Sequence, residues 1–458
     1  MIVALGFGAC MVAIVVAIYI IRTTKYIAVA SLQLVSAVVF VVIGMVWLHV
    51  EEASNWGGTP VLVASSGLLI ASIAVLLGRR QPIPKVVAPP NGDRADLFAR
   101  VTVSVVVLMV STSYFVLLGY VPIFTGLEQL VSSGGVVTPG LTNSARVSRD
   151  IYVNPDAAYI PMQGLLEMFR YFGCGTAAVI GLDMALRHDR RITGYIILAF
   201  AIGLVVATGQ RWPLMYLLAC IAIYLSLTST AGRAVWFRLL SITLVAAGVL
   251  TVLLGRTSDN ITSLAGGLLF AFGDLFERVF VGYVLIPFWS YGVSRELLLP
   301  EGGLTWFQNL RAFLPGPGES YPVTFYQVVS GDDIGFTAAP DVWTEGWINL
   351  GGLGVLLSSL VMVGLARAID WVLYRSAKSR NRAAVIALVL PVGVSTAFIP
   401  FSGLVFCLGA ILVASILTVV YLAARLIVQD RSYAGESGAN RFGYGRRHFD
   451  SARPRAHG

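Results

Sequence analysis

The chain has 458 residues, of which 57% are hydrophobic and 12% charged, and its mean hydropathy is +0.80. A soluble protein of this length carries about twice that charged fraction, so the composition excludes an ordinary soluble protein. The formal net charge of +8 comes from basic residues between apolar segments and in the tail, a pattern that sets membrane orientation and does not indicate nucleic-acid binding.

Apolar runs of about 20 residues predict an all-α, polytopic bundle of transmembrane helices. In chain order these runs occupy residues 2–21, 27–49, 59–78, 101–123, 160–186, 192–209, 212–230, 237–255, 345–366, 384–402 and 404–428. Every second connection is rich in Arg and Lys, as cytoplasmic loops are. We therefore expect about 11 spans, with the N-terminus outside and the C-terminus in the cytoplasm.

Two predicted outward-facing segments are too long to be simple turns. They cover about 125–159 and 256–344, and the later part of the second is rich in Gly, Pro and aromatic residues. Such loops lack a core of their own, so we expect them to lie over the bundle as a lid or binding surface. Residues 1–429 form the predicted transmembrane domain, and residues 430–458 a disordered, basic cytoplasmic tail.

The chain shows no pattern of a disulfide framework, a metal site or a cofactor site. All four cysteines lie inside apolar runs, and the four histidines are scattered along the chain. Clustered thiols or imidazoles at regular spacing are what such sites require. We therefore expect neither a metal nor a cofactor.

Three arginines adjoin or interrupt apolar runs on the predicted outer side, namely Arg170, Arg211 and Arg278. A charge there is costly. Each could pair with a nearby carboxylate such as Glu167, or extend its charged end to the membrane surface. Several together favour an anion site, because guanidinium groups bind diphosphate oxygens in pairs and keep their charge in a dry site. Arg146, in the first outward segment, belongs to the same predicted set, as does Arg149.

Two acids, Asp341 and Glu345, stand four residues apart just before a late apolar run. On a helix they share one face, where a carboxylate can act as a general base. The alternative is a structural role at the start of the helix, since acids favour the first turn and either Asp341 or Thr344 can cap it.

The stretch TGQRWPLMYLL around Arg211 resembles the "G-x-R-x-P/L-L" start of a span in the O-antigen polymerase (Wzy-like) family of oligosaccharide repeat-unit polymerases. The stretch FTAAPDVWTEGWINLGGLGVLL resembles the family's "T…(G/E)E-x-x-x-N-x-G-x-x-G" segment, with matching positions Thr337, Glu345, Asn349, Gly351 and Gly354. FERVFVGYV, with Arg278, is similar to the family's outer-side helix arginine.

The resemblance implies glycosyl transfer at the outer face of the plasma membrane between repeat units linked to undecaprenyl diphosphate. The implied partners are that lipid-linked oligosaccharide, the lipid bilayer and polysaccharide-assembly proteins. We expect Glu345 and Asp341 to be catalytic. The expected diphosphate- and glycan-binding residues are Arg211, Arg278, Arg170, Arg146, Arg149 and Asn349.

Other functions fit the same pattern. A metal-assisted glycosyltransferase that uses polyprenyl-phosphate sugars would place Glu51 and Glu52 as an acidic pair in the first outer loop. A glycan ligase would share nearly every feature above. A transporter or flippase of lipid-linked sugars fits less well, because the two halves of the sequence show no internal repeat.

Overall fold

The computed structural model describes residues 2–24, 29–46, 59–78, 94–132, 163–187, 190–208, 211–228, 305–307, 341–375, 382–395 and 402–442. All elements in these segments are helical, and six of the helices are long and apolar enough to cross a membrane. The chain is therefore a multi-span α-helical membrane protein, as the sequence predicts. The run at 237–255 lies outside the described residues, so the total of about 11 spans stays a prediction.

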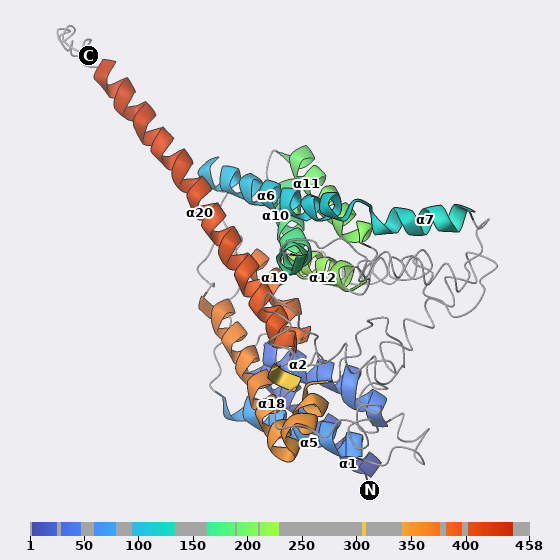
Figure 1. Ribbon diagram of the computed structural model, residues 1–458. Helices are drawn as coiled ribbons and strands as arrows, with labels where there is room; N and C mark the ends of the chain where they lie inside the picture. The colour runs from blue at the N-terminus through green and yellow to red at the C-terminus, as the bar shows by residue number, and fades with distance from the viewer. Residues whose placement is uncertain are drawn as a thin grey trace, which may run out of the picture.

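The described helices pack in two groups (Figure 1). The first group contains α1 (Ile2–Thr24), α2 (Val29–Ala37) with its π-helical turn η1 (Val38–Val42), α5 (Thr59–Leu77) and α18 (Val342–Arg375). The second group contains α6 (Arg94–Leu118), α9 (Gln163–Met168), the π-helical turn η2 (Phe169–Gly173), α10 (Cys174–Arg187), α11 (Arg191–Ala207), α12 (Arg211–Thr228) and α20 (Ser402–Phe442).

Helix α19 (Arg382–Ser395) joins the two groups and lies between them in the figures. Ile386 packs in the core of the first group, whereas Val392 packs in the core of the second. Gln33 of α2 donates from Nε2 to the carbonyl oxygen of Gly393 at 2.8 Å. Gly393 lies in the last turn of α19, where carbonyls have no donor within the helix, so the glutamine supplies a donor from outside it.

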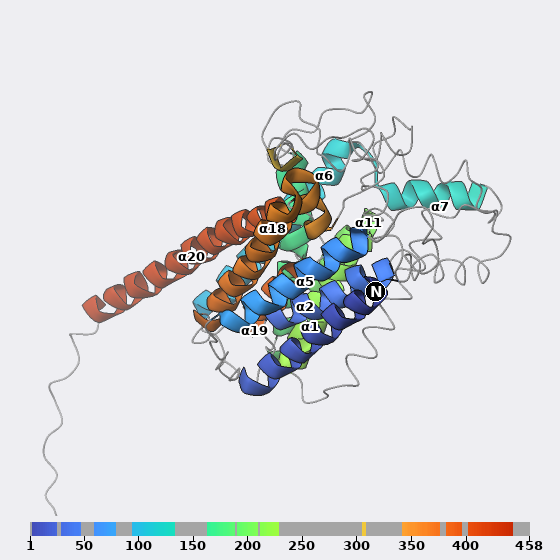
Figure 2. The same ribbon diagram turned by 90° about the horizontal axis from the view of Figure 1, so that it is seen from below.

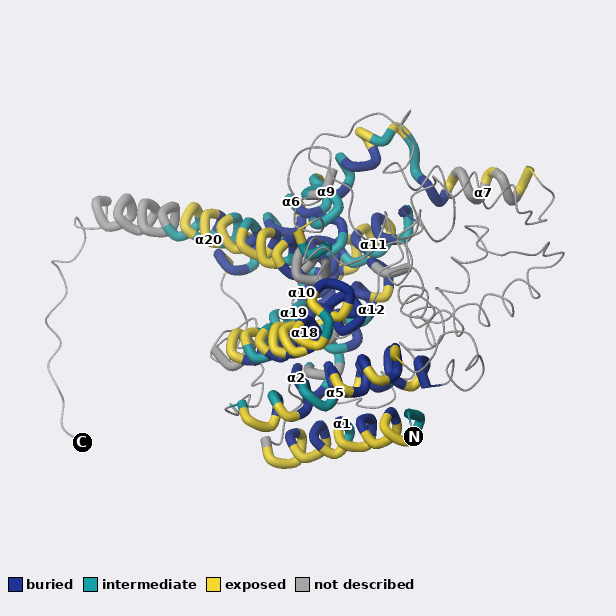
Figure 3. Tube along the Cα trace, turned by 60° about the horizontal axis from the view of Figure 1, so that its bottom comes forward, coloured by how far each residue is buried: buried dark blue, intermediate teal, exposed yellow. Residues whose placement is uncertain are grey.

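The helices have exposed outward faces (Figure 3), and many large apolar side chains lie on them. In α1, Phe7, Met11 and Val15 recur every four residues and are exposed, whereas Ala13 and Ala17 on the other side are buried. An exposed stripe of large apolar side chains along a whole helix is unfavourable in water and favourable in lipid. The exposed apolar side chains therefore indicate a surface that faces lipid, as the high mean hydropathy of the chain also does.

The charge pattern predicts that certain helix ends lie on the same side of the membrane, and several of these ends contact one another. Arg367 of α18 donates from Nη2 to the carbonyl oxygen of Val75, in the last turn of α5. Asp370 accepts through Oδ1 from the backbone N–H of Val29, the first residue of α2, at 2.8 Å. These ends share one side of the bundle, and its assignment to the cytoplasm stays a prediction.

Three boundaries differ from the sequence prediction. Helix α7 (Pro122–Ser132) occupies the start of the first outward segment, which was expected to be a loop from about 125. Helix α18 begins at Val342, before the expected end of the second outward segment. Helix α20 continues to Phe442, into the segment expected to be a disordered tail.

Candidate functional site

Helix α18 begins with a capped and buried first turn. Asp341 accepts through Oδ1 from the backbone N–H groups of Trp343 at 2.9 Å and Thr344 at 3.1 Å, and the Thr344 hydroxyl donates to Oδ2. Asp341 is thus the N-cap residue, the structural role that the sequence left open beside a catalytic one. Burial raises the pKa of Asp341, and the hydrogen bonds from Thr344 and Trp343 offset part of that rise.

The helix then breaks and folds back on itself. Leu350 (φ −140°, ψ 18°) and Gly351 (φ 60°, ψ −139°) are non-helical, and the Trp343 indole donates from Nε1 to the hydroxyl of Ser359 at 3.0 Å. In a straight helix these two residues would lie about 24 Å apart along the axis. Residues 342–349 therefore form a short arm that packs against a long arm, residues 352–375. The predicted span at 345–366 is split because a glycine permits this backbone conformation.

Close packing of glycines holds the two arms together. Added Cβ atoms at Gly346 and Gly354 would each collide with the backbone of the other glycine. The short arm also packs on α5, where the Trp343 ring covers Gly67 so closely that no side chain would fit at that position. Small residues allow a close approach between helical segments, and here the approach occurs within α18 itself.

Glu345 and Asn349 lie four residues apart on the short arm, and both are buried, with Glu345 0% exposed. The Asn349 amide donates from Nδ2 to the backbone carbonyl of Glu345 at 2.7 Å and also to the hydroxyl of Thr305. Thr305 belongs to the second outward segment, so one described residue of that segment contacts the short arm. Oδ1 of Asn349 is buried and accepts no hydrogen bond from the described residues.

Arg170 lies inside the second group, on the π-helical turn η2. Its side chain is 1% exposed, Nη2 lies 3.6 Å from Oε1 of Glu167, and Cζ lies 4.4 Å from the centre of the Tyr114 ring. Tyr171 places a second ring 5.4 Å from Cζ. A guanidinium held over aromatic faces and beside a carboxylate keeps its charge in a dry site. π-helical turns such as η2, which contain an extra residue, are frequent at functional sites.

Arg211 is the first residue of α12, and α11 ends just before it, at Ala207. The prediction that a helix starts at Arg211 is therefore confirmed, and this explains how a charge is tolerated in an otherwise apolar run. The position also puts the arginine at the positive end of a helix dipole, where backbone N–H groups favour anions. The structure describes the backbone of Arg211 and not its side chain.

The predicted site residues do not form a single described cluster. Asp341, Glu345 and Asn349 share the short arm of the first helical group, whereas Arg170 lies in the second group. The remaining predicted residues lie outside the described segments, namely Arg146, Arg149 and Arg278, together with Glu51 and Glu52 of the metal-assisted alternative. Their roles stay predictions.

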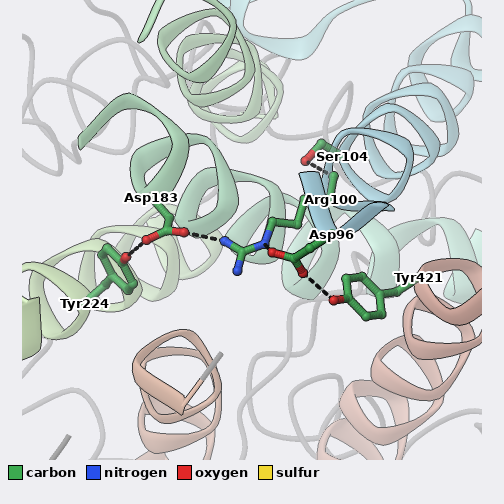
Figure 4. A network of polar contacts seen from close by, with 6 residues as sticks. All are labelled: Asp96, Arg100, Ser104, Asp183, Tyr224 and Tyr421. Carbon is green, nitrogen blue, oxygen red and sulfur yellow. Dashed lines mark hydrogen bonds and ion pairs between the residues drawn. The ribbon is translucent and has the colours of Figure 1, made fainter. Parts of the chain in front are cut away.

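A buried ionic network, which sequence reasoning missed, ties together four helices of the second group (Figure 4). Arg100 of α6 lies between two carboxylates, with Nε 3.0 Å from Oδ2 of Asp96 and Nη1 bonded to Oδ2 of Asp183 in α10. The hydroxyl of Tyr421 in α20 donates to Asp96, and that of Tyr224 in α12 donates to Asp183. The network lies where α6 begins and α10 ends, the side predicted to be cytoplasmic.

One signal in the sequence could have revealed this network. Asp183 interrupts the apolar run at 160–186, and ionisable residues within spans are rare and usually paired. Asp96 and Arg100 stand four apart at the start of an earlier apolar helix, which is the spacing of an ion pair on one face. Their partnership with Asp183 depends on tertiary packing.

No protein family, curated protein or solved structure matches this chain. Within the described segments, no three His, Cys, Asp or Glu side chains gather closely enough to hold a metal ion. The functional argument therefore depends on the chemistry of the chain's own residues.

Proposed function

We propose that the chain is a membrane glycosyltransferase that polymerises undecaprenyl-diphosphate-linked oligosaccharide repeat units into a surface polysaccharide at the outer face of the plasma membrane. The observation that carries the proposal is Arg170, a permanently charged group that is almost fully buried within the candidate span Leu165–Leu186. Charges at such positions are costly and usually serve a function. Its contacts with Tyr114 and Glu167 support the proposal, because they fix the position of the guanidinium group that would bind an anionic ligand.

The proposed reaction transfers the growing glycan from its lipid carrier to the incoming unit. A hydroxyl oxygen of the incoming sugar bonds to the anomeric carbon, and the bond from that carbon to the diphosphate breaks. Undecaprenyl diphosphate leaves with the negative charge, which paired N–H groups of arginine stabilise. Arg170 acts in this role with Arg211 at the start of α12, and with Arg278, Arg146 and Arg149 from the outward segments.

The hydroxyl proton needs an acceptor, for which Glu345 is the proposed general base. It lies on the buried short arm of α18, next to Asn349, whose amide oxygen is free to accept a hydrogen bond from a sugar hydroxyl. A base must stand within hydrogen-bonding reach of the proton that it removes. Asp341, which caps the same arm, is the second candidate, although capping already occupies both of its oxygens.

The split helix favours one other function, transport of lipid-linked sugars. Discontinuous helices in transporters bring half-helix ends and polar groups to a substrate at membrane depth, and the break at Leu350 and Gly351 has this form. The polymerase remains the better proposal because the motifs around Arg211 and Glu345 resemble polymerase segments, and because transport requires no general base.

Deletion of the chromosomal copy distinguishes these functions by the glycan that remains. Loss of polymerase activity leaves surface glycans that carry a single repeat unit. Loss of a flippase instead leaves lipid-linked units on the cytoplasmic leaflet, and loss of a ligase leaves full-length polymer on the lipid carrier. Normal polymer length on the normal acceptor after deletion would exclude the proposal.

A further inference from the structure

Helix α7 differs from the spanning helices in length and in polarity. Its residues, Pro122–Ser132, extend over only about 16 Å, whereas the hydrocarbon core of a membrane is roughly 30 Å thick. At 3.6 residues per turn, its apolar residues fall on one side, and Thr125, Gln129 and Ser132 fall on the other. The apolar residues are Ile123, Phe124, Leu127, Leu130 and Val131. Such a helix is too short to cross a bilayer and has the two faces of an interfacial helix.

Among the described side chains of α7, those that pack in the bundle belong to its first turn. Ile123 is buried in the same core cluster as Tyr114 and Phe115 of α6. Beyond that turn, α7 extends away from the other described helices (Figures 1 and 2), with Phe124 65% and Val131 77% exposed. These two residues stand seven apart, on one side of the helix. Two residues of the apolar face of α7 are therefore exposed in the part of the chain that the structure describes.

The connection to α6 holds α7 at the membrane boundary. Helix α6 ends at Leu118, Gly119 follows with a positive φ of 80°, and α7 begins at Pro122. Four residue steps reach at most about 14 Å, so the start of α7 lies close to the end of a candidate span. Val116 and Leu117 in the last turn of α6 are exposed. Exposed apolar side chains therefore occur on both sides of this connection.

We propose that α7 is an interfacial helix on the side of the membrane where α6 ends, and that the bilayer itself covers its apolar face. Its apolar face lies among the headgroups and the first acyl carbons, and Glu128, which is exposed, stays in contact with water. The helix thereby fixes the depth of the end of α6, which carries Tyr114 and so the aromatic face beneath Arg170. This inference is independent of the proposed reaction.

The test uses the full-length chain reconstituted in phosphatidylcholine vesicles. Val131→Cys is labelled with an environment-sensitive nitrobenzoxadiazole group, and phosphatidylcholine brominated near its headgroup is the quencher. The matched control is Ser132→Cys, the next residue, which is exposed on the polar side. The four native cysteines are buried, and unmodified chain carried through labelling measures their background. We expect the brominated lipid to quench the label at 131 roughly twofold or more beyond that at 132.

Equal quenching at the two positions would overturn the proposal, because an interfacial helix must present its two faces to different media. A disulfide or cross-link between two copies through the thiol introduced at position 131 would also overturn it, since a second copy would then be the occupant. Both substitutions are at exposed positions, and size-exclusion profiles establish that the labelled proteins stay folded. Polysaccharide synthesis by either variant has no bearing on the lipid contact, so the two proposals fail separately.

Discussion

At the scale of single residues, Arg170 is where the proposed chemistry and a purely structural role make opposite predictions. We expect Arg170→Lys to lower the rate of polymerisation about tenfold or more, because lysine keeps the charge but loses the planar pair of N–H donors. The assay is polymerisation of lipid-linked repeat units by purified protein in vesicles. Arg191→Lys, at an exposed position at the start of α11, is the matched control and should stay active.

Full polymer length in Arg170→Lys would reduce Arg170 to a helix anchor that pairs with Glu167. The same comparison applies to Arg211 and Arg278. If all three lysine variants retain activity, the diphosphate site that the arginines suggest does not exist.

Glu345 permits an equally sharp comparison. Glu345→Gln preserves the size of the side chain and one of its acceptors, yet it cannot take a proton from a hydroxyl group. We expect turnover to fall by roughly a hundredfold or more while lipid-linked substrate still binds, because removal of a general base slows the chemical step and not binding. Glu128→Gln on the exposed face of α7 is the control and should behave as the parent chain. Retained turnover in Glu345→Gln would pass the role of base to Asp341 or Glu167.

At the scale of elements, the hairpin within α18 depends on one backbone conformation. Gly351 has φ 60° and ψ −139°, a region that residues with a Cβ atom avoid, although no atom lies within 4 Å of the position that a Cβ would occupy. The cost of a side chain there is thus conformational and not steric crowding by neighbours. We expect Gly351→Ala to destabilise the fold by about 1–3 kcal/mol, measured as a lower midpoint of thermal unfolding in detergent.

Gly352→Ala is the matched control for this experiment. Gly352 also has open space around its Cβ position, but its backbone lacks a positive φ. Alanine there should leave the unfolding midpoint unchanged or raise it slightly, because alanine is the better helix former. Equal midpoints for the two variants would show that the break tolerates a side chain and that Gly351 does not determine it.

The helices were largely predictable from the sequence, but the hairpin was not. Long apolar runs predict membrane helices because a bilayer accepts little else. Gly351, Gly352 and Gly354 lie in a predicted span, where small residues usually serve contact between separate helices and so do not indicate a hairpin. The pattern of apolar residues is the same whether the chain turns back at Gly351 or continues straight. Contacts between the two arms, such as that between Trp343 and Ser359, distinguish the two.

The ionic network in the second group also acts at the scale of elements, because it links α20 to α6. We expect Tyr421→Phe to lower the free energy of unfolding by about 1 kcal/mol or more, because Asp96 loses a buried donor. Tyr195→Phe removes a hydroxyl from the exposed face of α11 and should change nothing. The comparison is made by unfolding both variants under the same detergent conditions. Indistinguishable curves would mean that this contact does not secure α20.

At the scale of the whole molecule, two sets of described contacts bear on the topology. Residues at the start of α6, the end of α10 and the end of α12 meet in the network around Arg100, and the end of α18 meets the start of α2 and the end of α5. The alternation of helix directions predicted from basic loops agrees with both sets of contacts. The charge pattern predicts that both sets of helix ends face the cytoplasm, because the connections there are rich in Arg and Lys.

Cysteine labelling in intact cells tests that assignment. We expect a membrane-impermeant maleimide to modify cysteines placed at Arg146 and Gly316, and to leave those placed at Arg79, Arg190 and Arg380 unmodified until the membrane is permeabilised. The buried native cysteines contribute little background, which the parent chain measures directly. The reverse pattern would put Arg170, Glu345 and the interfacial helix α7 on the cytoplasmic side. Polymerisation at the outer face would then be impossible for this site, whatever the activity of its individual residues.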